Sequence, residues 1–126
     1  MDRMSPAAAA AVHWGRPGRA GEIADLLTRY RTFLSRPGGR LLLVPSECPA
    51  CPGCARDDVA VVRDDLGDLY RELPPAARTE LGRVLRGLDA EFRRRTLPHP
   101  VPRAGSWVDW SGRPRAWWRR RLYEDD

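Results

Sequence analysis

Residues 74–95 constrain the fold of this chain more than any other stretch. Their apolar side chains recur at the three- and four-residue spacing of a helix, so they form one stripe while the other positions are polar. Pro74 and Pro75 stand where a helix can begin, and Pro98 follows its end. The pattern predicts an amphipathic helix over residues 75–96 on which the remaining segments pack. The stripe consists of Leu81, Val84, Leu85, Leu88 and Phe92.

Two further segments have helical periodicity. Residues 21–35 place their apolar side chains on one face, and the Pro-Gly-Gly sequence at residues 37–39 ends the segment. Residues 58–73 begin at Asp58, an acidic residue suited to capping a helix N-terminus. This segment also carries an acidic stripe, for which we expect arginine partners from a neighbouring helix. The stripe comprises Asp57, Asp58, Asp64, Asp65, Asp68 and Glu72.

Two shorter segments complete the predicted layout. Leu41–Val44 is a short apolar run, and its length favours a buried strand or extended segment. Its candidate partners are residues 107–110 or the neighbouring cysteine loop. Further along, Ser111 and Pro114 are typical of a helix start and predict a short fourth helix over residues 113–121.

The predicted fold class is mainly α: a small helical bundle of three helices plus a short fourth, with a cysteine-containing loop and little or no β structure. Residues 1–20 lack periodicity and are expected to form a flexible N-terminal arm, which leaves residues 21–126 as a single helical domain. One or two tryptophans are expected to close the core. The predicted core consists of Ile23, Leu26, Leu27, Tyr30, Leu34, Val62, Leu66, Leu69, Leu73, Leu81, Val84, Leu85, Leu88 and Phe92.

Composition limits how the charge can be interpreted. All 22 basic residues are arginine, and lysine, asparagine and glutamine are absent, a bias typical of a GC-rich bacterial genome. The net charge of +5 is therefore no direct sign of phosphate binding. No apolar run reaches the roughly 18–20 residues of a membrane span. The alanine run at residues 7–11 makes a poor signal peptide, so we expect a cytoplasmic protein without membrane association.

The most specific local pattern is a pair of overlapping C-x-x-C units formed by Cys48, Cys51 and Cys54. This spacing lets a tight turn present two sulfur atoms to one metal ion, and Gly53 is suited to let the backbone curl around them. Thiolates favour zinc or an iron–sulfur cluster over magnesium or calcium. The pattern therefore predicts a metal site, with zinc as the candidate ion.

The fourth metal ligand is the weak point of this prediction, because structural zinc sites use four ligands and the chain has three cysteines. The histidine candidates are His99 and His13, and the carboxylate candidates are Glu47, Asp57 and Asp58. A ferredoxin-type cluster would need a further cysteine downstream. Two other interpretations stay open: reversible disulfide chemistry, or three small buried side chains with no chemical role.

The second functional pattern is a basic, tryptophan-rich segment. Between residues 93 and 121 there are nine arginines and one acidic residue. Arginines can hold phosphates while tryptophans stack on bases. The alternative, which we weigh more heavily, is that the tryptophans pack on the helices while the arginines stack on them or pair with the acidic stripe. The candidate nucleic-acid- or partner-binding residues are Arg113, Arg115, Trp117, Trp118, Arg119, Arg120 and Arg121.

No catalytic motif accompanies these patterns. The chain has no nucleophile elbow, no phosphate-cradling glycine loop and no H-E-x-x-H sequence. We therefore expect a non-enzymatic binding or adaptor module, for a protein partner or a nucleic acid, in which zinc would fix the cysteine loop. The alternative is a thiol-redox protein that uses the three cysteines.

Overall fold

The computed structural model describes residues 19–48, 50–99, 111, 113 and 116–124. This described part is mainly helical and contains no β-strand, which confirms the predicted fold class. Its elements are α2 (Arg19–Leu34), α3 (Pro52–Ala55), α4 (Val59–Glu72), α5 (Pro75–Arg95) and the 3-10 helix η1 (Trp117–Arg119). Most of the expected N-terminal arm lies outside the described residues, and its last two residues already belong to α2.

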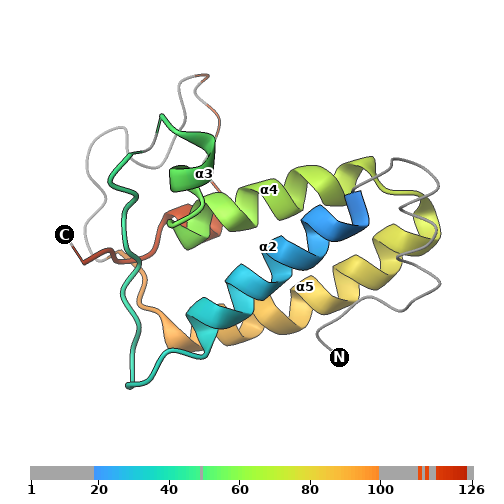
Figure 1. The fold of residues 1–126 in the computed structure, drawn as a ribbon. Coiled ribbons are helices and arrows are strands. Elements are labelled where there is room, and N and C mark those ends of the chain that lie inside the picture. The colour runs from blue at the N-terminus through green and yellow to red at the C-terminus, as the bar shows by residue number, and fades with distance from the viewer. Residues whose placement is uncertain (1–18, 49, 100–110, 112, 114–115, 125–126) are drawn as a thin grey trace.

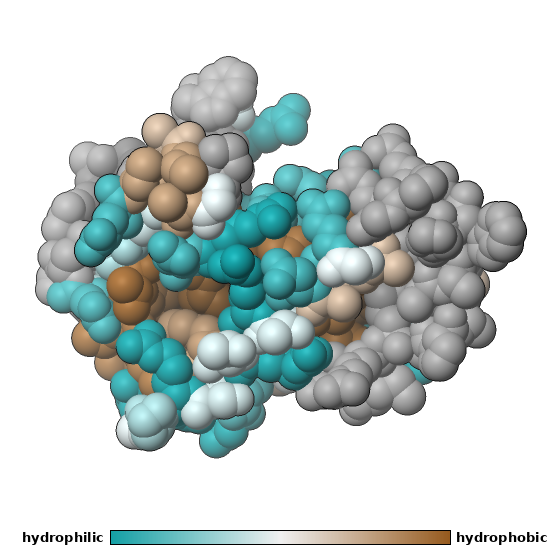
Figure 2. Space-filling model, viewed as in Figure 1, coloured by the Kyte–Doolittle hydropathy of each residue, from teal (hydrophilic) through white to brown (hydrophobic). Residues whose placement is uncertain are grey.

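The three long helices lie side by side (Figure 1). α4 and α5 form an antiparallel hairpin, and α2 packs on both, running in the same direction as α5. α3 and η1 stand near the start of α4. On the face shown in Figure 2, hydrophilic side chains cover much of the helical surface and apolar ones fill recesses between them. Among the described helices, none combines the length and apolar character needed to cross a bilayer.

Local chemistry sets the ends of the helices. Asp58 precedes α4, and its carboxylate accepts a hydrogen bond from the N–H of Ala60 at 2.9 Å, as predicted for a cap. α5 begins at Pro75, whose fixed φ suits the first position of a helix. α2 ends at Leu34, and just beyond it Gly38 has a φ of 114°, which glycine adopts without strain.

The core lies where the three long helices meet. Every residue predicted for the core is buried, including Leu81, Leu85 and Leu88 on the stripe of α5. The predicted helix therefore forms with its apolar stripe buried, but the most extensive helix–helix packing is between α2 and α4, not on α5. The structure adds further apolar residues to this core: Phe33, Leu41, Leu43, Val59, Ala60 and Ala77.

Aromatic rings join the helices at one end of the core. The ring of Phe92 is fully buried. Its centroid lies 5.8 Å from the ring centroid of Tyr30 and 5.5 Å from that of Trp117, and both pairs have edge-to-face geometry. Trp117 and Trp118 pack against the core, which confirms that tryptophans close it. This end of the bundle is therefore built from residues far apart in the chain.

The apolar run Leu41–Val44 is extended, with Leu41 and Leu43 buried and the residues between and after them half-buried. Leu41 forms a parallel bridge to Thr96, and Leu43 forms one to Tyr123. The N–H groups of the two leucines donate to backbone carbonyls of these flanking segments at 2.6 and 3.1 Å. The run is thus a buried extended segment, as predicted.

Its partners differ from those predicted. The cysteine loop does not pair with it, and residues 107–110 lie outside the described residues. One bridge instead uses the carbonyl of Arg95, one of the last carbonyls of α5, which has no partner within its own helix. Hydrophobic periodicity carries no information about such a pairing, because the partner is a helix end.

The short fourth helix is smaller than predicted. Of residues 113–121, only η1 is helical among those that the structure describes, and it forms a single turn. Ala116 precedes η1 and offers no side-chain cap, so Ser111 does not cap it as predicted, and Pro114 lies outside the described residues. The helix is short because the residues after it pair with two extended segments.

Candidate metal centre

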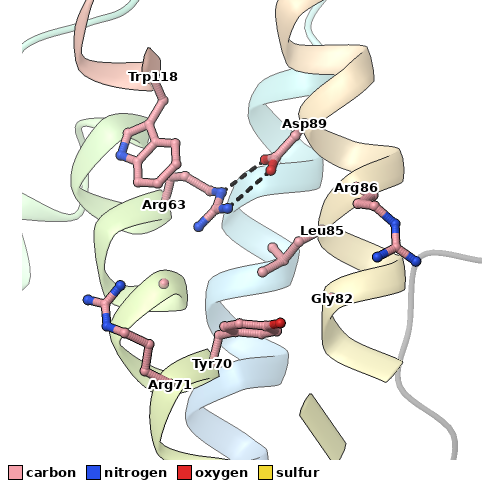
Figure 3. A pocket seen from close by; sticks show the side chains of 9 residues that line it. Arg63, Tyr70, Arg71, Gly82, Leu85, Arg86, Asp89 and Trp118 are labelled. Carbon is pink, nitrogen blue, oxygen red and sulfur yellow. Dashed lines mark hydrogen bonds and ion pairs between the residues drawn. The ribbon is translucent and has the colours of Figure 1, made fainter. Parts of the chain in front are cut away.

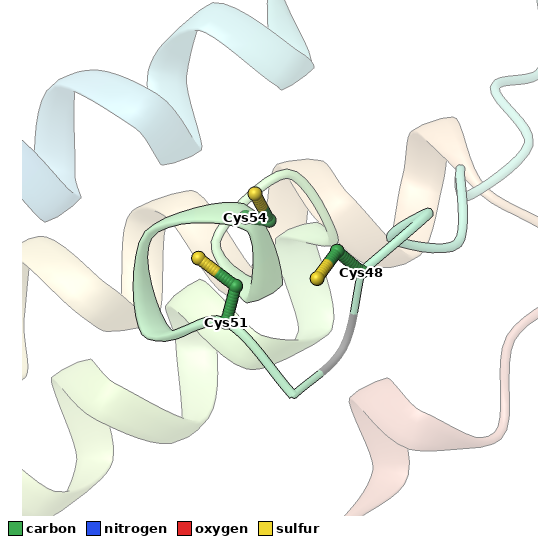
Figure 4. A group of neighbouring side chains, drawn as sticks. All are labelled: Cys48, Cys51 and Cys54. Atoms are coloured by element: carbon green, nitrogen blue, oxygen red, sulfur yellow. The ribbon is translucent and has the colours of Figure 1, made fainter.

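The three cysteines gather beside the start of α4 (Figure 4). Cys48 precedes α3, Cys51 occupies the position just before its first residue, and Cys54 lies within it. Their sulfur atoms all lie within 4.8 Å of one another, and none forms a disulfide. Cys48 is exposed and the other two are half-buried. The cysteines thus form a group that could hold a metal ion and that solvent can reach.

The single turn of α3 brings the sulfur atoms together. The N–H of Cys51 donates to the carbonyl of Cys48 at 3.1 Å, and the N–H of Ala55 donates to the carbonyl of Cys51 at 2.8 Å. Pro52 occupies the first turn, where its missing N–H costs nothing. The role predicted for Gly53 was wrong: its φ is not positive, and a Cβ there would meet nothing within 4 Å. A helical turn, not a glycine, curls the loop.

Ser46 closes the loop from the other side. Its hydroxyl donates to the carbonyl of Cys54 at 2.7 Å and accepts from the N–H of Cys48 at 3.3 Å. One side chain therefore ties the first and third cysteines together. Sequence reasoning missed this residue, although a serine just before a turn is a common side-chain partner for backbone groups.

Arg56 anchors the loop to the bundle. Its Nε donates to Asp65 on α4 at 3.1 Å, and its Nη2 donates to Glu22 on α2 at 3.3 Å. The hydrogen bond to Asp65 is the main cause that raises the pKa of Arg56. Because this side chain is only 30% exposed, the pair is screened less than a surface ion pair.

The thiols are not equivalent. The backbone N–H of Cys54, followed by its thiol and the N–H of Gly53, lowers the pKa of Cys51. The hydrogen bond with Cys51, followed by burial and the charge of Asp57, raises the pKa of Cys54. Cys51 therefore forms a thiolate more readily than Cys54.

No histidine or carboxylate among the described residues joins the three sulfur atoms. Asp58 is engaged elsewhere, since its carboxylate accepts from the hydroxyl of Tyr123 at 2.8 Å. His99 lies on the extended segment after α5, where its backbone N–H donates to the carbonyl of Arg120 at 3.0 Å. His13 lies outside the described residues. The described site is thus a three-sulfur group with a fourth position unassigned.

The segment around η1 binds the acidic stripe of α4. The indole Nε1 of Trp118 donates to Asp64 at 2.7 Å, and the Nε of Arg119 donates to the same carboxylate at 2.9 Å. Arginines do pair with the stripe. Arg56 precedes α4 in the chain, Arg71 lies within α4 and Arg119 lies in η1, so these partners do not come from a neighbouring long helix. The prediction that these arginines lie on a neighbouring helix was wrong, because hydrophobic periodicity does not show where the segments between helices lie.

Both indoles are also covered by guanidinium groups. The Arg63 guanidinium lies 4.1 Å from the ring centroid of Trp118, and that of Arg93 lies 4.1 Å from the centroid of Trp117. Cation–π stacking of this kind stabilises a partly buried ring by about 0.5–2 kcal/mol. These contacts follow the pattern in which tryptophans pack inward and arginines stack on them.

The other candidate binding residues differ in their exposure and in the groups that they contact. Arg121 donates to the hydroxyl and the carbonyl of Thr96, both at 2.8 Å, so it holds the extended segments together. Arg113 is exposed and Arg120 is half-buried. Arg115 lies outside the described residues. The described side-chain hydrogen bonds of this set go to α4, to α5 and to Thr96 instead of to the cysteine loop.

A polar network across the three long helices escaped sequence reasoning. Arg63 on α4 donates to both carboxylate oxygens of Asp89 on α5, at 2.9 and 3.1 Å. The hydroxyl of Tyr30 on α2 donates to the same carboxylate at 2.7 Å, and burial is the main cause that raises its pKa. The signal that could have revealed it is Asp89 itself, four residues after Leu85 and hence beside the apolar stripe.

Comparison of the chain with protein-family models, curated proteins and solved structures found no match. The candidate function therefore rests on the chemistry of the cysteine group and its surroundings.

Proposed function

We propose that the protein is a non-enzymatic binding module whose cysteine loop holds a zinc ion. The observation that carries the proposal is the convergence of three thiols within 4.8 Å of one another. Zinc bound tetrahedrally by thiolates at about 2.3 Å separates its sulfur ligands by about 3.8 Å. Adjustments of up to about 1 Å in a surface loop would bring the three sulfur atoms to that separation.

Each part of the loop has a role in this proposal. Cys48, Cys51 and Cys54 would supply the thiolates, and the lowered pKa of Cys51 favours the first deprotonation. Bound zinc would supply a cross-link between α3 and the segment before it. Arg56 would keep the cross-linked loop against α4. The fourth ligand would be His13, His99, water or a group of the partner, because no described residue joins the three sulfurs.

A cluster of positive charge supports an acidic partner, either an acidic protein surface or a nucleic acid. Arg121 donates to the carbonyl of Arg93, and Arg40 donates to the carbonyl of Arg94, so both guanidinium groups lie where α5 ends. Burial, followed by the charges of Arg93 and Arg40, lowers the pKa of Arg121. Arg93 and Arg40 are exposed, and so is Arg113 nearby in the chain. Such clusters attract phosphates in a salt-dependent manner.

Metal analysis of the full chain, purified under reducing and anaerobic conditions, tests the zinc proposal. We expect one zinc ion per chain, and loss of zinc in each of Cys48→Ser, Cys51→Ser and Cys54→Ser. Leu97→Ser, at an exposed position outside the loop, is the control and should keep its zinc. A chain that takes up no zinc would contradict the proposal. Iron found together with acid-labile sulfide would show that the loop holds an iron–sulfur cluster instead of zinc.

Filter binding across a salt series tests the partner. If the partner is a nucleic acid, affinity for single- or double-stranded DNA falls steeply as salt rises. Arg113→Glu should weaken that binding, whereas Arg83→Glu, an exposed change in the middle of α5, should have little effect. Absence of salt-dependent binding leaves an acidic protein surface as the proposed partner.

The unequal and closely spaced thiols favour one alternative function, thiol–disulfide exchange. The Cys51 thiolate would attack a disulfide of a partner protein, and one partner sulfur would leave as a thiolate. A second cysteine of the group would then displace the other partner sulfur, which leaves a disulfide in this protein and two thiols in the partner. The lowered pKa of Cys51 supports this assignment of the attacking thiol.

Thiol titration of the same preparation separates the two functions. Zinc-bound cysteines react slowly until a chelator is added, whereas a redox pair is reactive at once and forms a disulfide without metal. Three thiols that are unreactive in metal-free protein would contradict both functions and leave a purely structural role.

A further inference from the structure

A cavity of about 250 Å³ lies between α4 and α5, on a part of the bundle that the cysteine loop does not line. Its walls combine arginines with flat or apolar surfaces (Figure 3). Leu85 and Tyr70 supply apolar surface between the two helices, and Trp118 lies at one end of the cavity. This combination of apolar walls and a few polar groups is typical of small-molecule sites, although the volume suits only a small ligand.

Two glycines leave the space open. A Cβ at Gly82 would lie 3.2 Å from the ring of Tyr70. A Cβ at Gly67 would lie 3.3 Å from Nη1 of Arg63. Contacts this short force a neighbour to move, so any larger residue at either position would intrude on the cavity walls.

Arg63 presents an unused donor to this region. Its Nε and Nη2 are held by Asp89, its guanidinium stacks on Trp118, and its side chain is only 11% exposed. Nη1 is buried and has no hydrogen-bond partner among the described residues. A buried donor without a partner is costly, and an acceptor on a ligand would satisfy it.

The charges around the cavity are unbalanced. Asp89 already accepts from Arg63 and from Tyr30, so its charge is compensated. Arg71 pairs with Asp68 and remains 70% exposed. Arg86, on the exposed face of α5, makes no hydrogen bond or ion pair within the part of the chain that the structure describes. The cavity therefore has more positive than negative charge at its mouth.

We propose that this cavity binds a small organic anion, whose carboxylate or phosphate accepts from Nη1 of Arg63 and pairs with Arg86 while its apolar ring lies against Tyr70 and Leu85. Nη1 of Arg71 lies 3.9 Å from the Cβ position at Gly67, beside the unused donor. Because the Arg71 side chain is largely exposed, it can turn toward solvent and admit the ligand. This site is separate from the proposed zinc centre, and neither depends on the other.

Calorimetric titration of the full chain with benzoate and phenyl phosphate tests the proposal. Benzyl alcohol, which has the ring without the charge, and inorganic phosphate, which has the charge without the ring, are the comparison probes. We expect saturable binding of at least one aromatic anion at millimolar concentration and markedly weaker binding of both comparison probes. The stronger of the two anions identifies the acidic group. Absence of binding, or equal binding of benzyl alcohol, overturns the proposal.

A matched pair of charge reversals tests the location. Arg86→Glu and Arg83→Glu make the same change on exposed positions of α5, but only Arg86 lines the cavity. We expect Arg86→Glu to weaken binding by about tenfold or more and Arg83→Glu to change it little. Equal losses would show that the overall charge, not this site, attracts the anion. Arg86→Gln repeats the test if Arg86→Glu lowers stability.

Side-chain NMR of isotope-labelled arginine tests the unused donor directly. On titration with the aromatic anion, the Nη resonances of Arg63 should shift, while those of Arg29 on α2 should stay in place. Arg29 is a suitable reference because its guanidinium is held by Asp25 and does not line the cavity. Binding without any shift at Arg63 would contradict the proposed contact.

Discussion

The helical core and the cysteine loop are stabilised in different ways. The core buries aromatic and aliphatic side chains from all three long helices around Phe92. The cysteine loop buries little: one of its thiols is exposed, and it is held by backbone hydrogen bonds, Ser46 and Arg56. The core is therefore stable through area removed from water, whereas the loop depends on a few polar contacts and, in our proposal, on a metal ion.

This difference separates the residues that maintain the fold from those available for chemistry. Substitutions in the core should unfold the whole domain, because its helices share one buried cluster. Substitutions in the loop should change metal binding and local dynamics while the bundle persists. Four substitutions test this separation, from the largest expected effect to the smallest.

Phe92→Ala should cause the largest loss of stability. The ring is fully buried among Tyr30, Phe33 and Trp117, so its removal leaves a cavity at the junction of the helices. We expect the free energy of unfolding to fall by about 3–5 kcal/mol in urea denaturation. Cys54→Ser in metal-free protein is the comparison and should cost well under half of that. Equal losses would contradict the separation of core and loop.

Tyr123→Phe should have an intermediate effect. The Tyr123 hydroxyl donates to both oxygens of the buried Asp58 carboxylate, at 3.0 and 2.8 Å, and so ties the segment after η1 to the start of α4. Loss of the hydroxyl leaves that carboxylate short of a donor, and we expect a cost of about 1–3 kcal/mol. Leu97→Ala, at an exposed position, should change stability little. Denaturation in urea measures both variants.

Asp58 should make stability depend on pH in a definite direction. Burial raises the pKa of Asp58 above its ordinary value of 3.8, so the folded state holds this proton more tightly than the unfolded state. The contribution of Asp58 to the free energy of unfolding is therefore most favourable below pH 3.8. This contribution is lost as pH rises through the pKa of Asp58 in the folded state.

The difference in unfolding free energy between wild type and Asp58→Asn isolates this contribution. The difference should shift in favour of Asp58→Asn as pH rises through the acidic range. Asp57→Asn, which makes the same substitution at an exposed neighbour, is the control for the loss of one negative charge. A difference that moves in favour of wild type with rising pH would contradict a raised pKa at Asp58.

Arg56→Ala should have the smallest effect on global stability. Its two ion pairs are partly exposed, and we expect a loss of about 1 kcal/mol or less after allowance for solvent screening. The local effect should be clearer: amide exchange in α3 and alkylation of the cysteines should both accelerate. Arg29→Ala, which removes an ion pair within α2, should leave the loop unchanged. Unchanged alkylation in Arg56→Ala would show that the loop does not depend on this anchor.

The core could be predicted because helical periodicity reports directly on which side chains face inward. The spacing of Leu81, Leu85 and Leu88 was sufficient to orient α5, and the same reasoning oriented α2 and α4. The extended segments that pair with one another outside the helices could not be placed in this way. The pairing of Leu41 with Thr96 and of Leu43 with Tyr123 depends on unsatisfied backbone groups, which apolar spacing does not reveal.

The candidate site was predictable only in part. The spacing of Cys48, Cys51 and Cys54 predicted a tight turn that presents sulfur atoms to one ion, but not that this turn is the short helix α3. The ion-pair partners of the arginines were harder still to predict, because the arginine side chain is long and the chain contains many arginines. Only the fold shows that Arg63 pairs with Asp89 while Arg56 secures the cysteine loop.

X-ray absorption of zinc-loaded full-length protein tests the central claim, that three thiolates of the loop share one ion. We expect three sulfur neighbours at about 2.3 Å and one nitrogen or oxygen neighbour at about 2.0–2.1 Å. Each cysteine-to-serine variant should lose one sulfur neighbour or lose the ion altogether. A zinc shell made only of nitrogen and oxygen, or one unchanged in all three variants, would contradict the claim.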